Sequence, residues 1–201
     1  MSGPATTPPT GAGLAQSGRP CGPRVASDRA LPAEVVADLR TDHAGEIGAV
    51  CIYQGVLRVA RDPALRAFAQ RHLETEQAHL RKIEAWLPKE RHSRLLPIWR
   101  LAGFLTGALP ALLGPRAVYG TIEVVEQFVD QHYDEQIRHL EQYPELQTLR
   151  QMLLECQGDE VAHRDEAAAA RGTGRRGLIL RAWCWLVDAG SRGAVAVCRR
   201  I

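Results

Sequence analysis

The chain has 201 residues, of which 45% are hydrophobic and 24% charged, and its formal net charge is +2. This length allows one domain with a sizeable core, and the composition is that of an ordinary globular protein. The small net charge, without a basic stripe interleaved with aromatic residues, gives no indication of a nucleic-acid partner.

The first segment of the chain, residues 1–29, is rich in Pro, Gly, Ala, Ser and Thr. It buries too little apolar surface to order itself, so we expect a disordered tail. It has neither a charged start nor a continuous apolar run, and is therefore not predicted to be a signal peptide. An organelle transit peptide is an alternative, because acidic residues are absent before Asp28, but its prolines and glycines suit an amphipathic helix badly.

The rest of the chain, residues 30–201, is predicted to be a single all-α domain, because Ala, Leu, Arg, Glu and Gln dominate it. Two long helices are expected first, over residues 32–61 and 63–86, where apolar residues recur at helical spacing. A proline begins each of them, and Asp62 supplies an N-cap for the second. Both helices have acidic residues inside the apolar face, and a buried carboxylate must be paired or bound to a metal.

The stretch of residues 95–114 is the most apolar part of the chain and has about the 20 residues that a bilayer span needs. Prolines, glycines and Arg100 interrupt it, and a central arginine costs roughly 2.5–3.5 kcal/mol on insertion. We therefore expect a helix or bent hairpin that lies in the membrane interface or covers an apolar channel. A buried core helix is the alternative.

Two more amphipathic helices are predicted over residues 115–142 and 144–171, and a last apolar helix, rich in Trp and Arg, over residues 177–201. The mixture of Trp and Arg in the last helix suits a membrane interface. A helix that caps the bundle and keeps its basic face in water fits this pattern equally well.

A Glu-x-x-His motif occurs twice, at residues 76–79 and at residues 160–163. Residues three apart lie on the same face of a helix, so each motif can hold one metal ion. A single copy would be weak evidence. Here, however, each copy follows a Glu of the preceding long helix at a similar distance, Glu46 in one case and Glu126 in the other. The pattern indicates a duplicated helix pair.

The predicted metal ligands are Glu46, Glu76, His79, Glu126, Glu160 and His163. This ligand set is typical of ferritin-like four-helix bundles with a carboxylate-bridged di-iron or di-manganese centre. Zinc in structural sites prefers thiolates and calcium avoids histidine, so iron or manganese is favoured. Four carboxylates also balance the charge of two divalent ions. We predict that Glu76 and Glu160 bridge the two ions. Glu46 and His79 complete the ligands of one ion, and Glu126 and His163 complete those of the other.

Further residues are candidates for contacts around these ligands: His43, His132, Tyr133 and Asp159. Asp159 is expected to orient one ligand histidine through its second ring nitrogen. For the other three, an ordinary hydrogen-bonded place in the core is the preferred interpretation. The remaining histidines are expected to face solvent: His72, His92 and His139.

The cysteines are odd in number and include no Cys-x-x-Cys pair: Cys21, Cys51, Cys156, Cys184 and Cys198. We expect free thiols in a reducing, cytosolic compartment.

The segments around the ligands resemble the demethoxyubiquinone hydroxylase family, the di-iron ring hydroxylases of ubiquinone biosynthesis. The resemblance covers residues 31–201. Its segments are Asp42-His43-Ala44-Gly45-Glu46, Ile52-Tyr53-Gln54-Gly55, Glu76-Gln77-Ala78-His79-Leu80, Glu126 with His132-Tyr133 and Gln136-Ile137, and Asp159-Glu160-Val161-Ala162-His163. The first segment distinguishes this family from ferritins and rubrerythrins. Members often have two adjacent acids where this chain has Glu126-Gln127, so Glu123, one turn earlier, remains an alternative to Glu126.

The resemblance implies a monooxygenase in which the six predicted ligands hold two iron ions (Fe²⁺). With dioxygen as co-substrate, it would hydroxylate the benzoquinol ring of a polyprenyl methoxy-methyl-benzoquinol, demethoxyubiquinone. The electrons would come from the quinol or from NADH. It also implies two extra membrane-associated helices beside the ferritin-like bundle, and a peripheral protein of the cell membrane on the cytoplasmic side. In a eukaryote the place would be the matrix side of the mitochondrial inner membrane.

The expected partners are the polyprenyl quinol, the lipid surface, a second copy of the chain, and a ubiquinone-biosynthesis complex or a lipid-presenting accessory protein. Nucleic acid is not expected. Other hypotheses for the same bundle are a quinol oxidase, a tRNA hydroxylase, an iron- or peroxide-handling protein, and a non-catalytic scaffold. A tRNA enzyme needs a basic groove, a storage shell has little use for apolar segments, and a scaffold has no need of the full ligand set.

Overall fold

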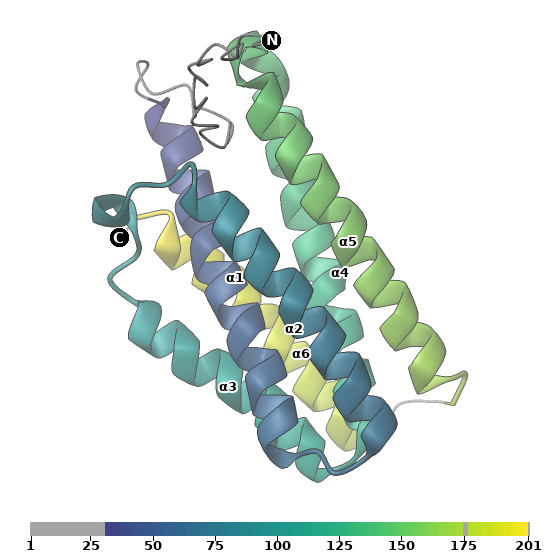
Figure 1. The fold of residues 1–201 in the computed structure, drawn as a ribbon. Helices are drawn as coiled ribbons and strands as arrows, with labels where there is room; N and C mark the ends of the chain where they lie inside the picture. The colour runs from purple at the N-terminus through teal and green to yellow at the C-terminus, as the bar shows by residue number, and fades with distance from the viewer. Residues whose placement is uncertain (1–30, 175–176, 201) are drawn as a thin grey trace, which may run out of the picture.

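The computed structural model describes residues 31–174 and 177–200, and this part of the chain is all-helical, as predicted (Figure 1). Four long helices form a bundle: α1 (Ala33–Val59), α2 (Pro63–Glu84), α4 (Pro115–His139) and α5 (Gln147–Arg171). Two further helices pack on it: α3 (Leu96–Leu112) and α6 (Leu178–Cys198). The predicted bundle with two extra apolar helices is confirmed. The predicted disordered tail lies outside the described residues.

Local sequence signals determine where the bundle helices begin and end. The Asp62 carboxylate accepts a hydrogen bond from the backbone N–H of Leu65 at 2.8 Å, and Pro63 occupies the first position of α2. Gly114, before α4, has a φ of 101°, a conformation that L side chains rarely adopt. Short 3₁₀ turns complete the connections: Lys89–Arg91, Leu140–Gln142 and Pro144–Leu146.

Helix α3 is a single continuous helix rather than a bent hairpin, although Pro110 lies inside it. It lies very close to α1, because its glycines face the α1 backbone. A Cβ on Gly107 would stand 1.9 Å from the carbonyl oxygen of Ile52, and one on Gly103 would stand 2.4 Å from that of Gly48. The glycines that interrupt the apolar stretch therefore allow close packing of two helices.

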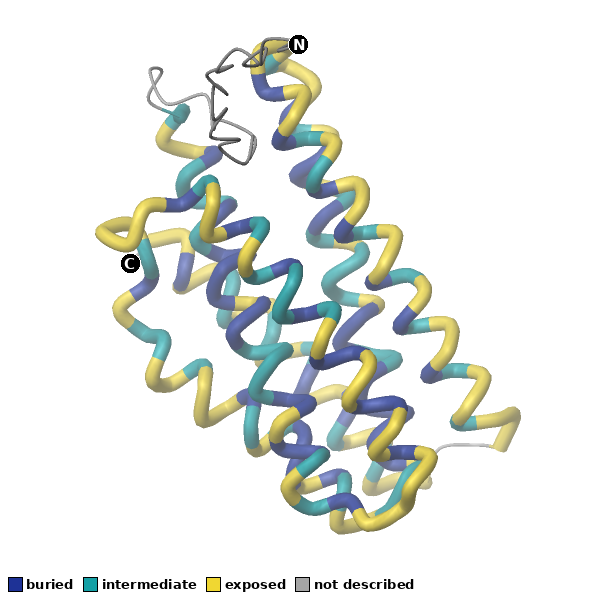
Figure 2. The backbone as a smooth tube through the Cα atoms, in the orientation of Figure 1, coloured by how far each residue is buried: buried dark blue, intermediate teal, exposed yellow. Residues whose placement is uncertain are grey.

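The interior of the bundle contains two apolar clusters, one toward each end. Figure 2 shows how buried positions recur along the helices of the bundle. One cluster includes Tyr53, Phe68 and Ile122, and the other includes Leu39 and Leu149. The segments of α1, α2, α4 and α5 between these clusters contain the predicted ligands. The site therefore lies in the middle of the bundle, enclosed at both ends by packed side chains.

Helix α6 packs mainly against α4, and the indole N–H of Trp183 donates a hydrogen bond to the Thr121 hydroxyl at 3.0 Å. The outer faces of α3 and α6 expose large apolar side chains: Ile98, Leu101, Leu105, Leu109, Leu112, Leu178, Ile179, Trp185, Leu186 and Val197. Four cysteines are free, as expected: Cys51, Cys156, Cys184 and Cys198. Cys21 lies outside the described residues.

Candidate metal centre

All six predicted ligands meet at the centre of the bundle. Their ligand atoms form two overlapping groups, each within 4.8 Å: Glu46, Glu76, His79 and Glu160 in one, and Glu76, Glu126, Glu160 and His163 in the other. Glu76 and Glu160 belong to both groups, which is the arrangement that bridging carboxylates require. Glu123, the alternative to Glu126, is not in either group and pairs instead with Arg171 at 2.7 Å.

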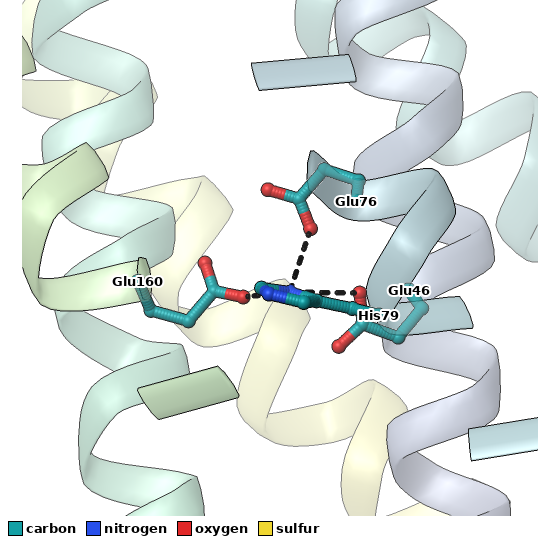
Figure 3. Close-up of side chains that lie close together, drawn as sticks. All are labelled: Glu46, Glu76, His79 and Glu160. Carbon is teal, nitrogen blue, oxygen red and sulfur yellow. Dashed lines mark hydrogen bonds and ion pairs between the residues drawn. The ribbon is translucent and has the colours of Figure 1, made fainter. Parts of the chain in front are cut away.

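The two histidines face the carboxylates through the same ring atom, Nδ1. In His79 this atom lies 3.0 Å from Glu160 Oε1 and 3.8 Å from the nearest oxygens of Glu46 and Glu76. Figure 3 shows these three contacts as dashed lines. In His163 it lies 3.1 Å from Glu76 Oε1 and 3.5 Å from Glu160 Oε2. The two Glu-x-x-His motifs therefore enter the site in equivalent ways from α2 and α5.

The site is dry, and several of its polar atoms have no hydrogen-bond partner. All six ligands are buried, and the most exposed of them, His163, has 7% of its surface accessible to solvent. The buried atoms without a partner include Glu46 Oε2, Glu76 Oε1, Glu160 Oε2 and His163 Nδ1. Leaving such an atom unsatisfied costs roughly 1–3 kcal/mol. Cations between these atoms would satisfy all of them, so the residues fit a two-metal centre.

Two tyrosines hold the outer carboxylates by reciprocal hydrogen bonds. The hydroxyl of Tyr133, on α4, donates to Glu46 Oε1 on α1 at 2.5 Å. The hydroxyl of Tyr53, on α1, donates to Glu126 Oε1 on α4 at 2.9 Å. A third outer contact joins Asp159 Oδ2 to His79 Nε2 at 3.0 Å. Tyr133 and Asp159, two of the candidates from the sequence, therefore contact predicted ligands.

Two other expected neighbours of the ligands form their polar contacts elsewhere. The ring of His43 packs on that of His92, with centroids 3.7 Å apart, and its nearest acid is Glu84. His132 lies within hydrogen-bonding distance of Thr41 and Gln136. Both occupy a hydrogen-bonded or packed place in the core, which was the preferred interpretation for them.

The expectation that His72 faces solvent is wrong. It is 2% exposed, its ring lies 4.0 Å from that of His163, and its Nε2 is 3.1 Å from Glu166 Oε2. Its position within the apolar stripe of α2 was the available signal. His92 and His139 are partly exposed.

Tyr53 is the other site residue that the sequence analysis missed. It follows Glu46 by seven residues, as Tyr133 follows Glu126 by seven, so the duplication itself contained the signal. Seven residues correspond to two helical turns, which place each tyrosine on the same face as its Glu.

The electrostatics of the metal-free site reflect four carboxyl groups in a small buried volume. Burial, followed by the charge of Glu160, raises the pKa of Glu46 to about 7, and raises the pKa values of Glu76 and Glu126 well above their ordinary range. Burial alone would raise the pKa of Glu160 too, but the nearby imidazoles of His163 and His79 lower it to about 2. Burial opposes charge on His79, yet its bonds to Glu160 and neighbouring acids raise its pKa to about 9. Without a bound cation, the buried carboxyl groups of Glu46, Glu76 and Glu126 therefore favour their protonated forms.

Comparison with known proteins gives a consistent result. The family model of the ubiquinone biosynthesis protein COQ7 matches residues 33–198. A mitochondrial NADPH-dependent 3-demethoxyubiquinone 3-hydroxylase from Caenorhabditis elegans is 29% identical over 180 residues, which cover 88% of this chain and 94% of that protein. The 3-demethoxyubiquinol 3-hydroxylase of Rhodospirillum rubrum is 33% identical over 184 residues, or 89% and 84% of the two chains. The mitochondrial enzyme of Mus musculus is 35% identical over 131 residues, and the match spans 60% of its length.

Proposed function

The chain belongs to the family of the ubiquinone biosynthesis protein COQ7, and on that premise we propose that it hydroxylates the benzoquinol ring of demethoxyubiquinone. The expected reaction class, a hydroxylation in ubiquinone biosynthesis, is confirmed by the family and by the relatives named as hydroxylases. The proposed substrate is a polyprenyl methoxy-methyl-benzoquinol. One atom of dioxygen enters a ring C–H bond and the other leaves as water, with two electrons supplied by the quinol or by a reduced nicotinamide.

We further propose that two iron ions bind at the centre of the bundle. Glu46 and His79 would complete one ion and Glu126 and His163 the other, with Glu76 and Glu160 shared. The observation that supports this most strongly is the pair of overlapping buried ligand groups with unpartnered atoms between them. When bound, such a centre supplies the activation of dioxygen that ring hydroxylation requires.

The residues of this chain contribute geometry and a dry environment. Tyr53 and Tyr133 hold the outer carboxylates, and Asp159 holds the ring of His79. The apolar clusters at both ends of the site exclude water, which strengthens electrostatic interactions inside. Because both ring nitrogens of His79 are engaged, its orientation toward the other ligands is set before any ion arrives.

The outer faces of α3 and α6 support a peripheral place on a membrane. In the described part of the chain, the segment Leu96–Leu113 alone meets the length and hydropathy expected of a membrane span, and 22% of it is buried. Because α3 packs closely on α1 and includes Arg100, we propose that it lies in the interface rather than across the bilayer. The isoprenoid tail of the substrate would stay in the lipid.

The proposed location is the cytoplasmic face of the cell membrane, or the matrix face of the mitochondrial inner membrane. The relatives from C. elegans and mouse are named mitochondrial. We also propose that the chain assembles with a second copy of itself, with a ubiquinone-biosynthesis complex or with a lipid-presenting protein.

Complementation with lipid extraction tests the function. Cells that accumulate demethoxyubiquinone would express the wild-type chain, Glu160→Ala, or Glu155→Ala, which changes an exposed Glu of the same helix. We expect mature ubiquinone with the wild type and Glu155→Ala and none with Glu160→Ala. If the wild type fails although it is iron-loaded and membrane-bound, the substrate is wrong, and quinol oxidation becomes the next reaction to assay.

A further inference from the structure

The duplicated site is symmetric at its ligands but not one contact further out. The reciprocal bonds of Tyr53 and Tyr133 are equivalent, and so are the two Nδ1 atoms that face the shared carboxylates. The residues that precede the shared carboxylates differ, however. Asp159 precedes Glu160, whereas Thr75 occupies the equivalent place before Glu76.

Asp159 acts on only one of the two histidines. Its Oδ2 lies 3.0 Å from Nε2 of His79, while Nδ1 of the same ring faces the carboxylates of the site. A carboxylate on the outer nitrogen of a ligand histidine fixes the tautomer and the ring orientation, and makes the inner nitrogen a better donor to a metal. The Asp159 side chain is 52% exposed, so its effect comes chiefly from positioning rather than from its charge.

His163 has no such support. Among the described residues, the acids within 4.0 Å of its ring nitrogens are Glu76 and Glu160, and both lie nearest to Nδ1. The Thr75 hydroxyl, which the symmetry would direct toward His163, bonds instead to the backbone oxygen of Arg71 at 3.4 Å. The ring of His163 is flanked by the ring of His72. A ring contact does not select which nitrogen bears the proton.

We propose that the two metal positions are unequal, and that the position completed by Glu46 and His79 binds a divalent ion more tightly than the one completed by Glu126 and His163, because Asp159 supports only the first. This rests on the proposed metal centre. The supported position fills first, and the unsupported position loses its ion first. Asp159 is thus a positioning residue that acts through His79.

The test measures metal binding rather than turnover. Metal-free protein would be titrated with Co²⁺ without oxygen, and the visible absorption of the bound ion followed. His163→Ala retains the supported position and His79→Ala the unsupported one. Adding Asp159→Asn should weaken Co²⁺ binding about 10–100-fold in the His163→Ala protein and less than about twofold in the His79→Ala protein.

A matched control separates positioning from charge. Asp165 lies on the same helix, is exposed and pairs with Arg164, so Asp165→Asn removes an equal charge without a contact to either histidine. It should leave both backgrounds unchanged. Circular dichroism would check that each variant is folded. If a ligand variant does not fold, Asp159→Asn in the otherwise intact site provides the test. This change should bring the two stepwise dissociation constants for Co²⁺ closer together.

Equal effects of Asp159→Asn in both backgrounds, or equal affinities at the two positions of the wild type, would overturn the inequality. These results would leave the proposed hydroxylation standing. A wild-type chain that binds no Co²⁺ would instead overturn the metal centre itself, and complementation by that chain would then have to be explained without it.

Discussion

At the scale of single residues, the buried carboxyl groups of the site disfavour one another's charge, whereas His79 and Glu160 stabilise each other's charged forms. Glu46 keeps its proton in the folded, metal-free chain up to about pH 7, compared with an ordinary pKa of 4.5, because it is buried and lies near the charge of Glu160. His79 keeps its proton to about pH 9, compared with 6.5, because hydrogen bonds to acidic partners outweigh its burial. Both groups therefore bind a proton more tightly in the folded state than in the unfolded state.

These shifts predict how the stability of the metal-free protein depends on pH. The contribution of a group with a raised pKa is complete below its unfolded value and is lost as pH rises through the folded one. The windows are 4.5 to about 7 for Glu46 and 6.5 to about 9 for His79. We expect the melting temperature, measured with a chelator present, to fall most clearly between about pH 6.5 and about pH 9, because at lower pH the lowered pKa values of the buried His43 and His72 oppose the contribution of Glu46. Glu46→Gln should make the melting temperature depend less on pH in the acidic half of this interval.

Metal should reverse the trend, because it binds deprotonated carboxylates and neutral imidazole. The rise in melting temperature on adding Fe²⁺ without oxygen should therefore grow with pH over the same interval. A rise that shrinks with pH would mean that the metal binds elsewhere.

The reciprocal tyrosines give a second prediction for single residues. Tyr53→Phe removes a buried hydroxyl that donates to Glu126, and should lower the free energy of unfolding of the metal-free protein by about 0.5–1.5 kcal/mol. Tyr133→Phe should cost a similar amount, because its contact with Glu46 is equivalent. Tyr119 is also buried, but its hydroxyl bonds to no acid of the site, so Tyr119→Phe is the control. Urea titration would measure all three, and equal losses in all would contradict the assigned bonds.

At the scale of elements, the close contact of α1 and α3 decides which face α3 leaves outside. Gly107 touches the backbone at Ile52, and Gly55, on α1, touches the backbone at Phe104 in return. Backbone atoms cannot move aside without moving a whole helix. The glycines therefore hold α3 in one orientation, with its leucines outward.

A single methyl group tests this contact. Gly107→Ala places a Cβ 1.9 Å from the Ile52 carbonyl oxygen and should cost about 1–3 kcal/mol of stability, despite the better helix propensity of Ala. Gly158→Ala, in α5, has open space around the new Cβ and should be neutral or stabilising by up to about 1 kcal/mol. Thermal unfolding of both variants makes the comparison. A stable Gly107→Ala protein would show that α3 can move away from α1.

At the scale of the whole molecule, α3 and α6 both pack mainly on α1 and α4, so their apolar outer faces belong to one side of the bundle. Arginines accompany them, including Arg100 in α3 and Arg181 and Arg192 in α6. Apolar side chains next to arginines match the boundary between acyl chains and anionic headgroups. This surface supports the proposed membrane docking.

Replacing both Leu105 and Leu109 by Asp should abolish that docking. The two leucines are 41% and 43% exposed, so the change should not unfold the chain. Losing the burial of two leucines, at about 1.5–3 kcal/mol each, should reduce partitioning into vesicles with anionic lipid far more than tenfold. Leu154→Asp, on α5, is the control, and iron content should stay unchanged throughout. Unchanged sedimentation with vesicles would refute the membrane-facing role of α3.

The sequence by itself determined the helices, their order and the six candidate ligands, because helical periodicity and the spacing of Glu and His are local properties of the chain. It could not decide between Glu123 and Glu126, which lie one turn apart, until the packing of α4 paired the first with Arg171. It also missed the burial of His72 and the bond of Tyr53 to Glu126, since both depend on which helix faces which. Only the tertiary structure showed that Asp159 contacts one of two equivalent histidines, because that contact joins α5 to α2 across the bundle.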